Sequence, residues 1–243
     1  RNVMSIAESA LGDAVDLMQS ARETLVAAGN GSYSDSERQA LAAKLSEIRK
    51  QLLSVANRPD GSGGYVFGGQ GMSSVPFTEA SSTPPNTVIF NGQRGQIQAS
   101  SSEAINLTVD GQRTWLQGRN PDGSLSTVNI FDTLQTAITN LNTPGLSSSV
   151  IQSNVTSGMA DVDKILGNMQ SARSEVGEAL NRMDGIESRI ADLKLAAQTE
   201  KSNAEDLDMT QAISEFTNRQ SGYQAALQSY ASIQKLSLFQ YLS

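Results

Sequence analysis

The stretch that decides the fold is ILGNMQSARSEVGEALNRMDGIESRIADLKLAA, residues 165–197. Apolar residues recur in it at alternating spacings of four and three, which places them along one side of an α-helix. Ten consecutive positions fit this rhythm: Ile165, Met169, Ala172, Val176, Ala179, Met183, Ile186, Ile190, Leu193 and Ala197. So long a repeat predicts a long helix that lies in a helical bundle or a coiled-coil seam.

Two helices are predicted near the start of the chain. Residues 4–28 and 41–55 carry apolar residues at the same three-four spacing, and a glycine-containing loop separates them. Ser34 and Glu37 precede the second of these runs. Their spacing predicts a capping box, in which the hydroxyl accepts from the N3 amide and the carboxylate accepts from the cap amide.

Two further helices are predicted in the second half of the chain. One covers residues 131–141 and ends at Pro144-Gly145. The other begins at about Leu207 and has Gln220 and Gln234 at polar positions in an otherwise apolar row. Polar interruptions of this kind specify the register of a seam rather than its maximal stability. The apolar members of the row are Met209, Ile213, Phe216, Tyr223, Leu227 and Tyr230.

Between residues 65 and 130 the apolar residues no longer recur at the three-four spacing of a helix. Short β-branched runs, some of them alternating, are separated by Asn91-Gly92, Asp110-Gly111 and Asp122-Gly123, which are typical of hairpin turns. We therefore expect a small antiparallel β region. Its strands are predicted in NTVIFNG (86–92), GQIQASS (95–101), INLTVDG (105–111), RTWLQG (113–118) and STVNI (126–130).

Together these patterns predict a mainly α fold with a β insert. An elongated helical bundle is built from both ends of the chain, and the β-rich domain is inserted between them. We place residues 1–64 in the N-terminal half of the bundle and 65–130 in the insert. Residues 131–200 form the C-terminal half of the bundle, and 201–243 form a terminal amphipathic helix.

Composition and charge exclude several classes of function. The chain has 18 Lys and Arg against 25 Asp and Glu, a net charge of −7, and no basic cluster, which argues against a nucleic-acid partner. It has no His and no Cys, so imidazole bases, thiolate nucleophiles, disulfides and the His-Glu-x-x-His zinc motif are all absent. The glycine-rich run GSGGYVFGGQG (61–71) fits neither common nucleotide-binding pattern. We predict no cofactor, no metal site and no membrane insertion.

The chain ends in LQSYASIQKLSLFQYLS, residues 227–243. Large apolar residues crowd positions 236–242, and one helix face cannot take up all of them. A Leu or Phe side chain that stays exposed to water forgoes roughly 1.5–3 kcal/mol of stabilisation relative to a buried one. We therefore weigh two interpretations equally, namely contact with another molecule and docking onto the chain's own bundle.

Particular segments resemble a known family. Residues 7–57 resemble the N-terminal half of the helical core of bacterial flagellins. The glycine-framed motif GGYVFGG (63–69) and the ending YQAALQSYASIQKLSLFQYLS (223–243) resemble the hook-associated protein 3 family, the hook–filament junction proteins of the flagellin superfamily. The motif residues that carry this resemblance are Gly64, Tyr65, Val66, Phe67, Gly68 and Gly69.

The resemblance implies a structural subunit, not an enzyme, that is secreted through the flagellar type III system and joins hook to filament. It implies contacts with neighbouring copies, with another hook-associated protein and flagellin, and, before export, with a cytoplasmic chaperone. It also implies a helical segment ahead of Arg1 that pairs with the terminal helix. The implied contact residues are Tyr223, Leu227, Tyr230, Ile233, Leu236, Leu238, Phe239 and Leu242.

Two other functions stay open at this point. A flagellin, which is the subunit of the filament itself, has the same helical organisation. A glycan or cell-wall hydrolase carried on a helical stalk is the alternative from another class, and it needs a pair of carboxylates in the insert.

Overall fold

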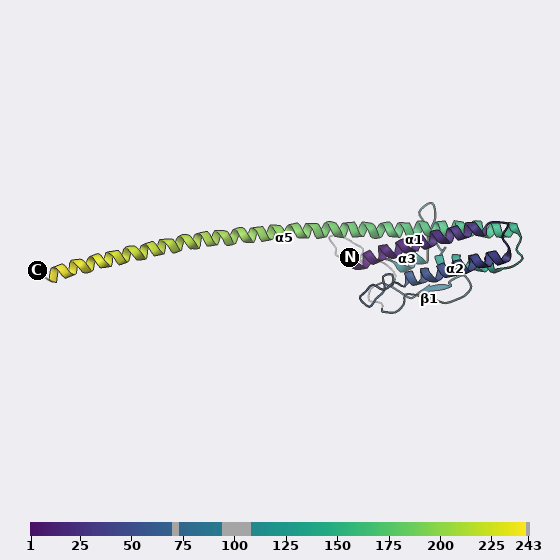
Figure 1. The fold of residues 1–243 in the computed structure, drawn as a ribbon, viewed down its shortest axis with the longest axis horizontal. Helices are drawn as coiled ribbons and strands as arrows, with labels where there is room; N and C mark the ends of the chain where they lie inside the picture. Colours follow the sequence, from purple (N-terminus) through teal and green to yellow (C-terminus); the bar gives the residue numbers. More distant parts are fainter. Residues whose placement is uncertain (70–72, 94–107, 242–243) are drawn as a thin grey trace. The chain divides into compact units, whose positions relative to one another are not determined.

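A computed structural model describes residues 1–69, 73–93 and 108–241 (Figure 1), with the backbone alone for 206–208 and 234–241. The chain divides into two compact units, Arg1–Asp184 and Gly185–Ser243. The mainly α fold with a β insert is confirmed.

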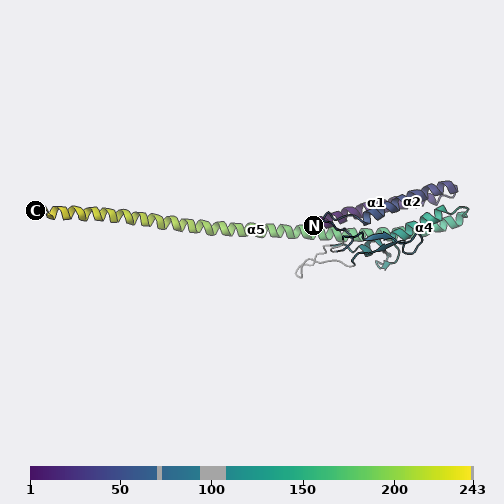
Figure 2. The ribbon, with the colours of Figure 1, turned by 90° about the horizontal axis from the view of Figure 1, so that it is seen from below.

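Four helices form the first unit together with the insert. They are α1 (Asn2–Ala28), α2 (Asp35–Ala56), α4 (Ile130–Asn142) and the first part of α5 (Ser148–Tyr241), as Figures 1 and 2 show. The predicted capping box of α2 is confirmed. The Ser34 hydroxyl accepts from the Glu37 amide at 3.3 Å, and the Ser34 amide donates to the Glu37 carboxylate at 2.7 Å.

Helix α1 runs antiparallel to the first part of α5. Ion pairs join Arg1 to Asp184, Glu8 to Arg173 and Arg22 to Asp163, each at 2.7–2.8 Å. Such exposed pairs are screened by solvent and contribute little individually, so they fix alignment more than stability.

Both helices bury an apolar side. The buried side of α1 is rich in alanine, and its fully buried alanines are Ala7, Ala10, Ala14, Ala21 and Ala28. The predicted seam of α5 is buried between Ile165 and Met183 except at Ala172, which is half-buried. Ile165, Met169 and Val176 are at most 2% exposed.

The described part of the insert contains two short antiparallel pairs. Strand β1 (Phe77–Glu79) pairs with β2 (Val88–Phe90), which confirms the strand predicted in 86–92. Strand β3 (Gly118–Arg119) pairs with β4 (Leu125–Ser126), and Gly123, with a φ of 84°, lies in the turn between them. The hairpin turn predicted at Asp122-Gly123 is therefore confirmed.

Two strand predictions in the insert are wrong because a side chain caps a helix instead. In the run RTWLQG, residues Gly111–Trp115 form helix α3, since the Asp110 carboxylate accepts from the Arg113 amide at 3.0 Å. In the run STVNI, the strand ends at Ser126, and the Asn129 side chain accepts from the Asp132 amide at 2.8 Å to begin α4. The strand predicted at 95–101 and residues 105–107 of the strand predicted at 105–111 lie outside the described residues. The described remainder, residues 108–111, is wrong as a strand, because residues 108–110 pair with no strand and Gly111 begins α3.

Helix α5 covers both the long helix and the terminal helix that the sequence predicts, without a break in its backbone. The domain boundaries at 64–65, 130–131 and 200–201 stay predictions.

A buried amide and a carboxylate fasten the insert to the helices. Asn168 of α5 is 2% exposed, and its Nδ2 donates to the carbonyl oxygens of Arg113 (2.8 Å) and Gln117 (2.9 Å) around the end of α3. Asp132 of α4 accepts from the amides of Asn86 and Thr87 and from the Thr87 hydroxyl. Partial burial raises the pKa of the Asp132 carboxyl, but these hydrogen bonds outweigh it and hold the pKa below its usual value.

Candidate interaction surface

The glycine-framed motif at residues 64–69 belongs to the core and not to a binding surface. The motif directly follows a tight turn, in which the Asp60 carboxylate accepts from the amides of Ser62 (2.8 Å) and Gly64 (2.9 Å). Tyr65 pairs across this turn with Pro59. The next residues of the motif, Val66 and Phe67, are buried.

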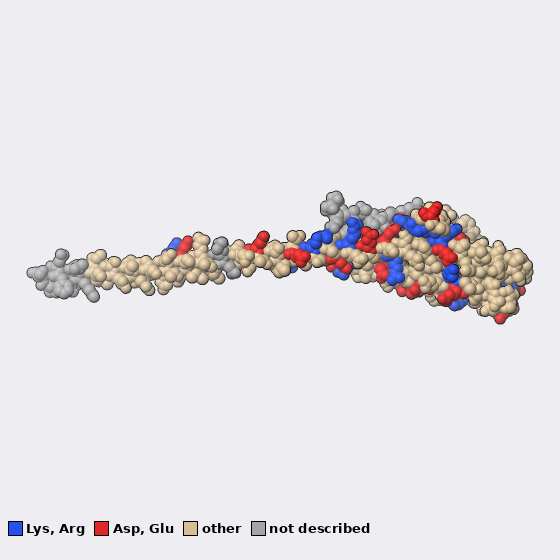
Figure 3. All heavy atoms as spheres, turned by 90° about the horizontal axis from the view of Figure 1, so that it is seen from above, with Lys and Arg blue, Asp and Glu red and all other residues tan. Residues whose placement is uncertain are grey.

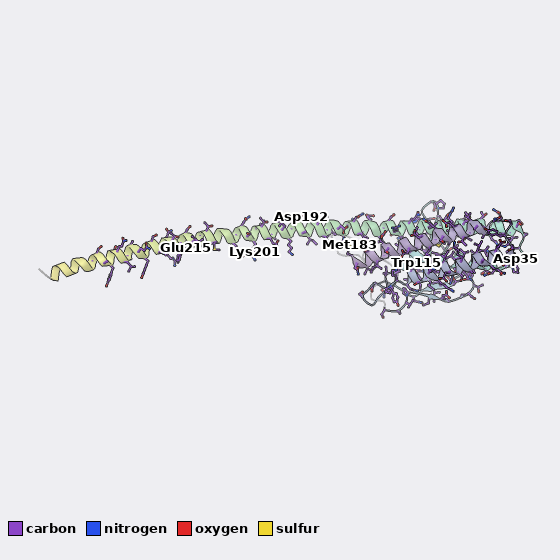
Figure 4. The ribbon with its side chains drawn as sticks, in the orientation of Figure 1. Asp35, Trp115, Met183, Asp192, Lys201 and Glu215 are labelled. Carbon is purple, nitrogen blue, oxygen red and sulfur yellow. The ribbon has the colours of Figure 1, made fainter. Side chains whose placement is uncertain are left out.

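Phe67 is part of a cluster of aromatic rings that joins the insert to the helices. Its ring packs edge-on against Trp115, with centroids 5.3 Å apart, and Trp115 stacks on Phe131 of α4 at 6.3 Å. Phe77 of β1 packs against Trp115 from another direction at 6.2 Å. Trp115, labelled in Figure 4, is fully buried, so the motif's aromatic residue helps to hold three segments together.

The glycines of this region permit close backbone approaches. Gly69 has a φ of +83°, which a residue with a Cβ adopts only with strain. The Gly68 carbonyl accepts from the Gln93 amide at 2.9 Å. At the start of α3, a Cβ on Gly111 would run into the carbonyl oxygen of Phe67. These approaches explain in structural terms why glycines follow Phe67 in the motif and why a glycine begins α3.

The second unit has a very different surface. In the described part of α5 beyond Asp184, ten large apolar side chains are 51–70% exposed. They are Ile190, Leu193, Leu195, Met209, Ile213, Phe216, Tyr223, Leu227, Tyr230 and Ile233. Monomeric soluble proteins rarely expose so many large apolar side chains on one helix, which makes this the candidate interaction surface.

The ten-residue seam predicted from the sequence therefore divides into a buried part and an exposed part. Met183 is 9% exposed, whereas Ile190 is 60% and Leu193 is 70% exposed. The predicted position in the bundle is therefore wrong for the last three members of the seam, Ile190, Leu193 and Ala197, which the single chain leaves exposed. Periodicity identifies the apolar side of a helix, but it does not tell whether the same chain covers that side.

We name two sets of residues on this part of α5. The first stripe continues the seam and consists of Ile186, Ile190, Leu193 and Ala197. The second stripe is the apolar row of the predicted terminal helix and consists of Met209, Ile213, Phe216, Tyr223, Leu227 and Tyr230.

Half of the predicted contact residues can be placed. Tyr223, Leu227, Tyr230 and Ile233 are all exposed on α5. The side chains of Leu236, Leu238 and Phe239, and residue Leu242 as a whole, lie outside the described residues.

Charged side chains thin out along this surface, as Figure 3 shows. Residues 209–233 contain two charged residues, Glu215 and Arg219, whose side chains approach to 3.9 Å on the same helix. Residues 185–208 contain nine, including Asp192 and Lys201, which Figure 4 labels. The second stripe therefore offers a partner few charges and a mainly apolar surface.

Metal-binding clusters and membrane-spanning helices are not found among the described residues. No group of three or more acidic side chains among them could hold a metal ion. No helix in the part of the chain that the structure describes is long and apolar enough to cross a membrane.

The fold and this surface are those of a flagellin-type helical protein. Residues 1–71 match the bacterial flagellin N-terminal helical region, and residues 159–242 match the bacterial flagellin C-terminal helical region. The two matches correspond to the two ends of the chain that the sequence assigns to the bundle.

Curated relatives show which family within this class the chain belongs to. Flagellar hook-associated protein 3 of Salmonella typhimurium is 30% identical, and that of Escherichia coli is 32% identical. Both alignments cover 98% of this chain and 76% of the relative. The chain therefore belongs to the flagellar hook-associated protein 3 family, whose members are structural proteins of the flagellum and not enzymes. A flagellin of Listeria monocytogenes is 22% identical over 89% of the chain and 66% of its own length.

Solved structures share the fold. FlgL of Xanthomonas campestris superimposes with a TM-score of 0.71 at 18% identity, over 83% of this chain and 94% of its own. The flagellar junction protein FlgL of Legionella pneumophila gives a TM-score of 0.66 at 19% identity, over 75% of this chain and 92% of its own.

Gly111→Ala tests whether the motif works through close packing. The new Cβ meets a backbone carbonyl, which cannot move aside as a flexible side chain can, so we expect a loss of about 1–3 kcal/mol in the free energy of unfolding. The matched control is Gly167→Ala in α5, where a Cβ meets open space and the change should stabilise the helix by about 0.5–1 kcal/mol. Equal effects in urea unfolding would contradict this account of the motif.

Proposed function

We propose that this chain is a structural subunit of the junction between the hook and the filament of the bacterial flagellum. Membership of the hook-associated protein 3 family supports this role, as does the likeness in fold to a protein named as a flagellar junction protein. The observation that carries the proposal is the exposed apolar surface of α5, because a joining subunit has to leave part of its apolar surface for its neighbours.

The two units suit two tasks in such a subunit. The first unit has its own buried core and can keep its shape without a partner. The second unit exposes its second stripe, which would be covered by neighbouring copies, by another hook-associated protein and by flagellin. Burying a Phe, Tyr or Leu of this stripe stabilises each contact by roughly 1.5–3 kcal/mol.

The same surface suits an export chaperone before assembly. A cytoplasmic chaperone that grips an amphipathic helix lays its groove over the apolar anchors at i, i+3, i+4 and i+7. Tyr223, Leu227 and Tyr230 have this spacing and are exposed. Secretion through the flagellar type III system and a final place outside the cell complete the proposal.

A flagellin remains the alternative within the same class. The identity to a flagellin is 22%, against 30–32% to hook-associated protein 3, so the junction role is favoured. The two roles differ in what the protein builds, because a filament subunit polymerises without limit and a junction subunit does not.

Deletion of the gene in the source organism tests the junction role. We expect cells that still make hooks but release flagellin monomers into the medium and do not swim, with both defects restored by a plasmid copy. The purified protein should form no long filaments at concentrations at which flagellin does. Filaments of the purified protein in electron micrographs would favour the flagellin alternative and contradict the junction role.

Substitutions on the second stripe test the chaperone contact. The triple variant Tyr223→Ser, Leu227→Ser and Tyr230→Ser removes the apolar anchors, so we expect chaperone affinity to fall by more than about 100-fold. The control variant Gln224→Ser, Gln228→Ser and Ala231→Ser changes neighbouring residues outside the stripe and should bind normally. Circular dichroism should show the first unit folded in both. Unchanged affinity of the stripe variant in calorimetry would rule out this contact.

A further inference from the structure

Two Asn-Gly pairs occur in the chain, Asn30-Gly31 and Asn91-Gly92. Asparagine is a chemically labile residue. A glycine after it has no Cβ to hinder its peptide nitrogen, so that nitrogen can approach the side-chain amide of the asparagine. Because the two pairs are the same dipeptide, a difference in their reactivity has to come from the structure around them.

The first pair lies in the exposed turn between α1 and α2. The Asn30 side-chain oxygen Oδ1 accepts two hydrogen bonds from Ser32, one from the amide at 3.1 Å and one from the hydroxyl at 2.8 Å. Among the described residues, none accepts a hydrogen bond from the Asn30 Nδ2. A Cβ built on Gly31 would meet nothing within 4 Å. The turn therefore has room to bring the Gly31 nitrogen onto the Asn30 Cγ.

The second pair is held by its neighbours. The Asn91 Nδ2 donates to the Thr78 hydroxyl at 2.8 Å. Gly92 is packed so closely that a Cβ on it would come to 2.3 Å from the Phe90 ring and to 2.7 Å from the Gly68 carbonyl oxygen. Attack of the Gly92 nitrogen on the Asn91 side chain has to displace these contacts, whereas Gly31 has open space around it.

The geometry at Asn30 suits deamidation, which needs no reagent except water. Hydroxide removes the Gly31 amide proton, and the Gly31 nitrogen forms a bond to the Asn30 Cγ, an attack favoured by its being intramolecular. Negative charge develops on Oδ1, the atom that the Ser32 amide and hydroxyl already contact. Donors placed where negative charge develops lower the barrier.

The remaining steps release ammonia. The bond between Cγ and Nδ2 breaks, and Nδ2 leaves as ammonia with a proton from water, which regenerates hydroxide. Water then adds to either carbonyl of the cyclic imide and opens it, which gives aspartate or isoaspartate at position 30. The sum of the steps is the asparagine plus one water giving the acid plus ammonia.

We propose that Asn30 is a site of spontaneous deamidation, that Ser32 accelerates the reaction, and that the fold protects Asn91 from it. This inference does not depend on the proposed function. It identifies the turn between α1 and α2 as the place where the covalent structure of the chain changes with time.

The modification changes an end of the first unit that is poor in charge. Residues 24–34 and 133–160 contain no Lys, Arg, Asp or Glu. The α1–α2 turn and the α4–α5 turn meet at this end, because the Gly145 amide donates to the carboxylate of Asp35, which Figure 4 labels, at 3.1 Å. Deamidation places a carboxylate in the first of these stretches. The isoaspartate product also adds a methylene group to the main chain between the two helices.

Mass spectrometry of the ageing protein tests the proposal. The purified full-length chain is kept at mildly alkaline pH, and samples taken over time are digested with trypsin. Asn30 is the one asparagine in the tryptic peptide 23–38, so the mass change of deamidation in this peptide is assigned to it directly. Fragment ions assign the change at Asn91. A sample taken at the start corrects for deamidation during digestion.

We expect the Asn30 amide to be lost at least about tenfold faster than the Asn91 amide in the folded chain, since about 1.4 kcal/mol of barrier is a tenfold change in rate. In the chain unfolded by urea, the two rates should become similar. Equal rates in the folded chain, faster loss at Asn91, or no loss at Asn30 would each overturn the proposal.

Substitutions separate the role of Ser32 from that of the dipeptide. Ser32→Ala removes the hydroxyl donor and keeps the amide donor, so the loss at Asn30 should slow several-fold while the rate at Asn91 stays the same. The matched control is Ser36→Ala, which changes an exposed serine of the same peptide and should leave both rates unchanged. Circular dichroism should show both variants folded. An unchanged rate at Asn30 in Ser32→Ala, or equal slowing in Ser36→Ala, would overturn the role of Ser32.

Discussion

The packing of α1 against the buried seam of α5 is the contact on which the rest of the first unit depends. Leu25 lies beside Gly158 near one end of this contact, and Met4 lies with Ala172 and Val176 around one small cavity near the other. Because α5 is fixed by α1, its Asn168 can fasten the end of α3, and α3 in turn carries Trp115 into the aromatic cluster. The described strands of the insert are short, and these contacts hold them against the helices.

The helices were predictable because their signals are local and repetitive. The four-three rhythm and the capping box at Ser34 and Glu37 both led to the observed helices. The insert was less predictable because Asp110-Gly111 is compatible with both a hairpin turn and a helix N-cap, and the tertiary contacts of Trp115 favour the helix. The core role of the glycine-framed motif could not be predicted from spacing, since it depends on backbone approaches between segments far apart in the sequence.

The candidate surface shows a more general limit of sequence periodicity. The same rhythm that is buried at Met169 and Val176 is exposed at Ile190 and Leu193, and nothing in the pattern marks the change. Burial is decided by which other helices are present, so an amphipathic helix in an assembling protein carries information about partners that the single chain lacks. Family membership supplies the context for this surface, namely a structural protein that assembles with other flagellar components.

Hydrogen exchange along α5 tests the central claim, which is that one helix serves as core in the first unit and as contact surface in the second. In the isolated chain, the account predicts strong protection of amides at 165–183 and weak protection at 209–233, because the latter open locally without unfolding the core. In assembled flagella, amides at 209–233 should become as protected as those of the core. Equal protection of both stretches in the isolated chain, or no gain at 209–233 on assembly, would contradict it.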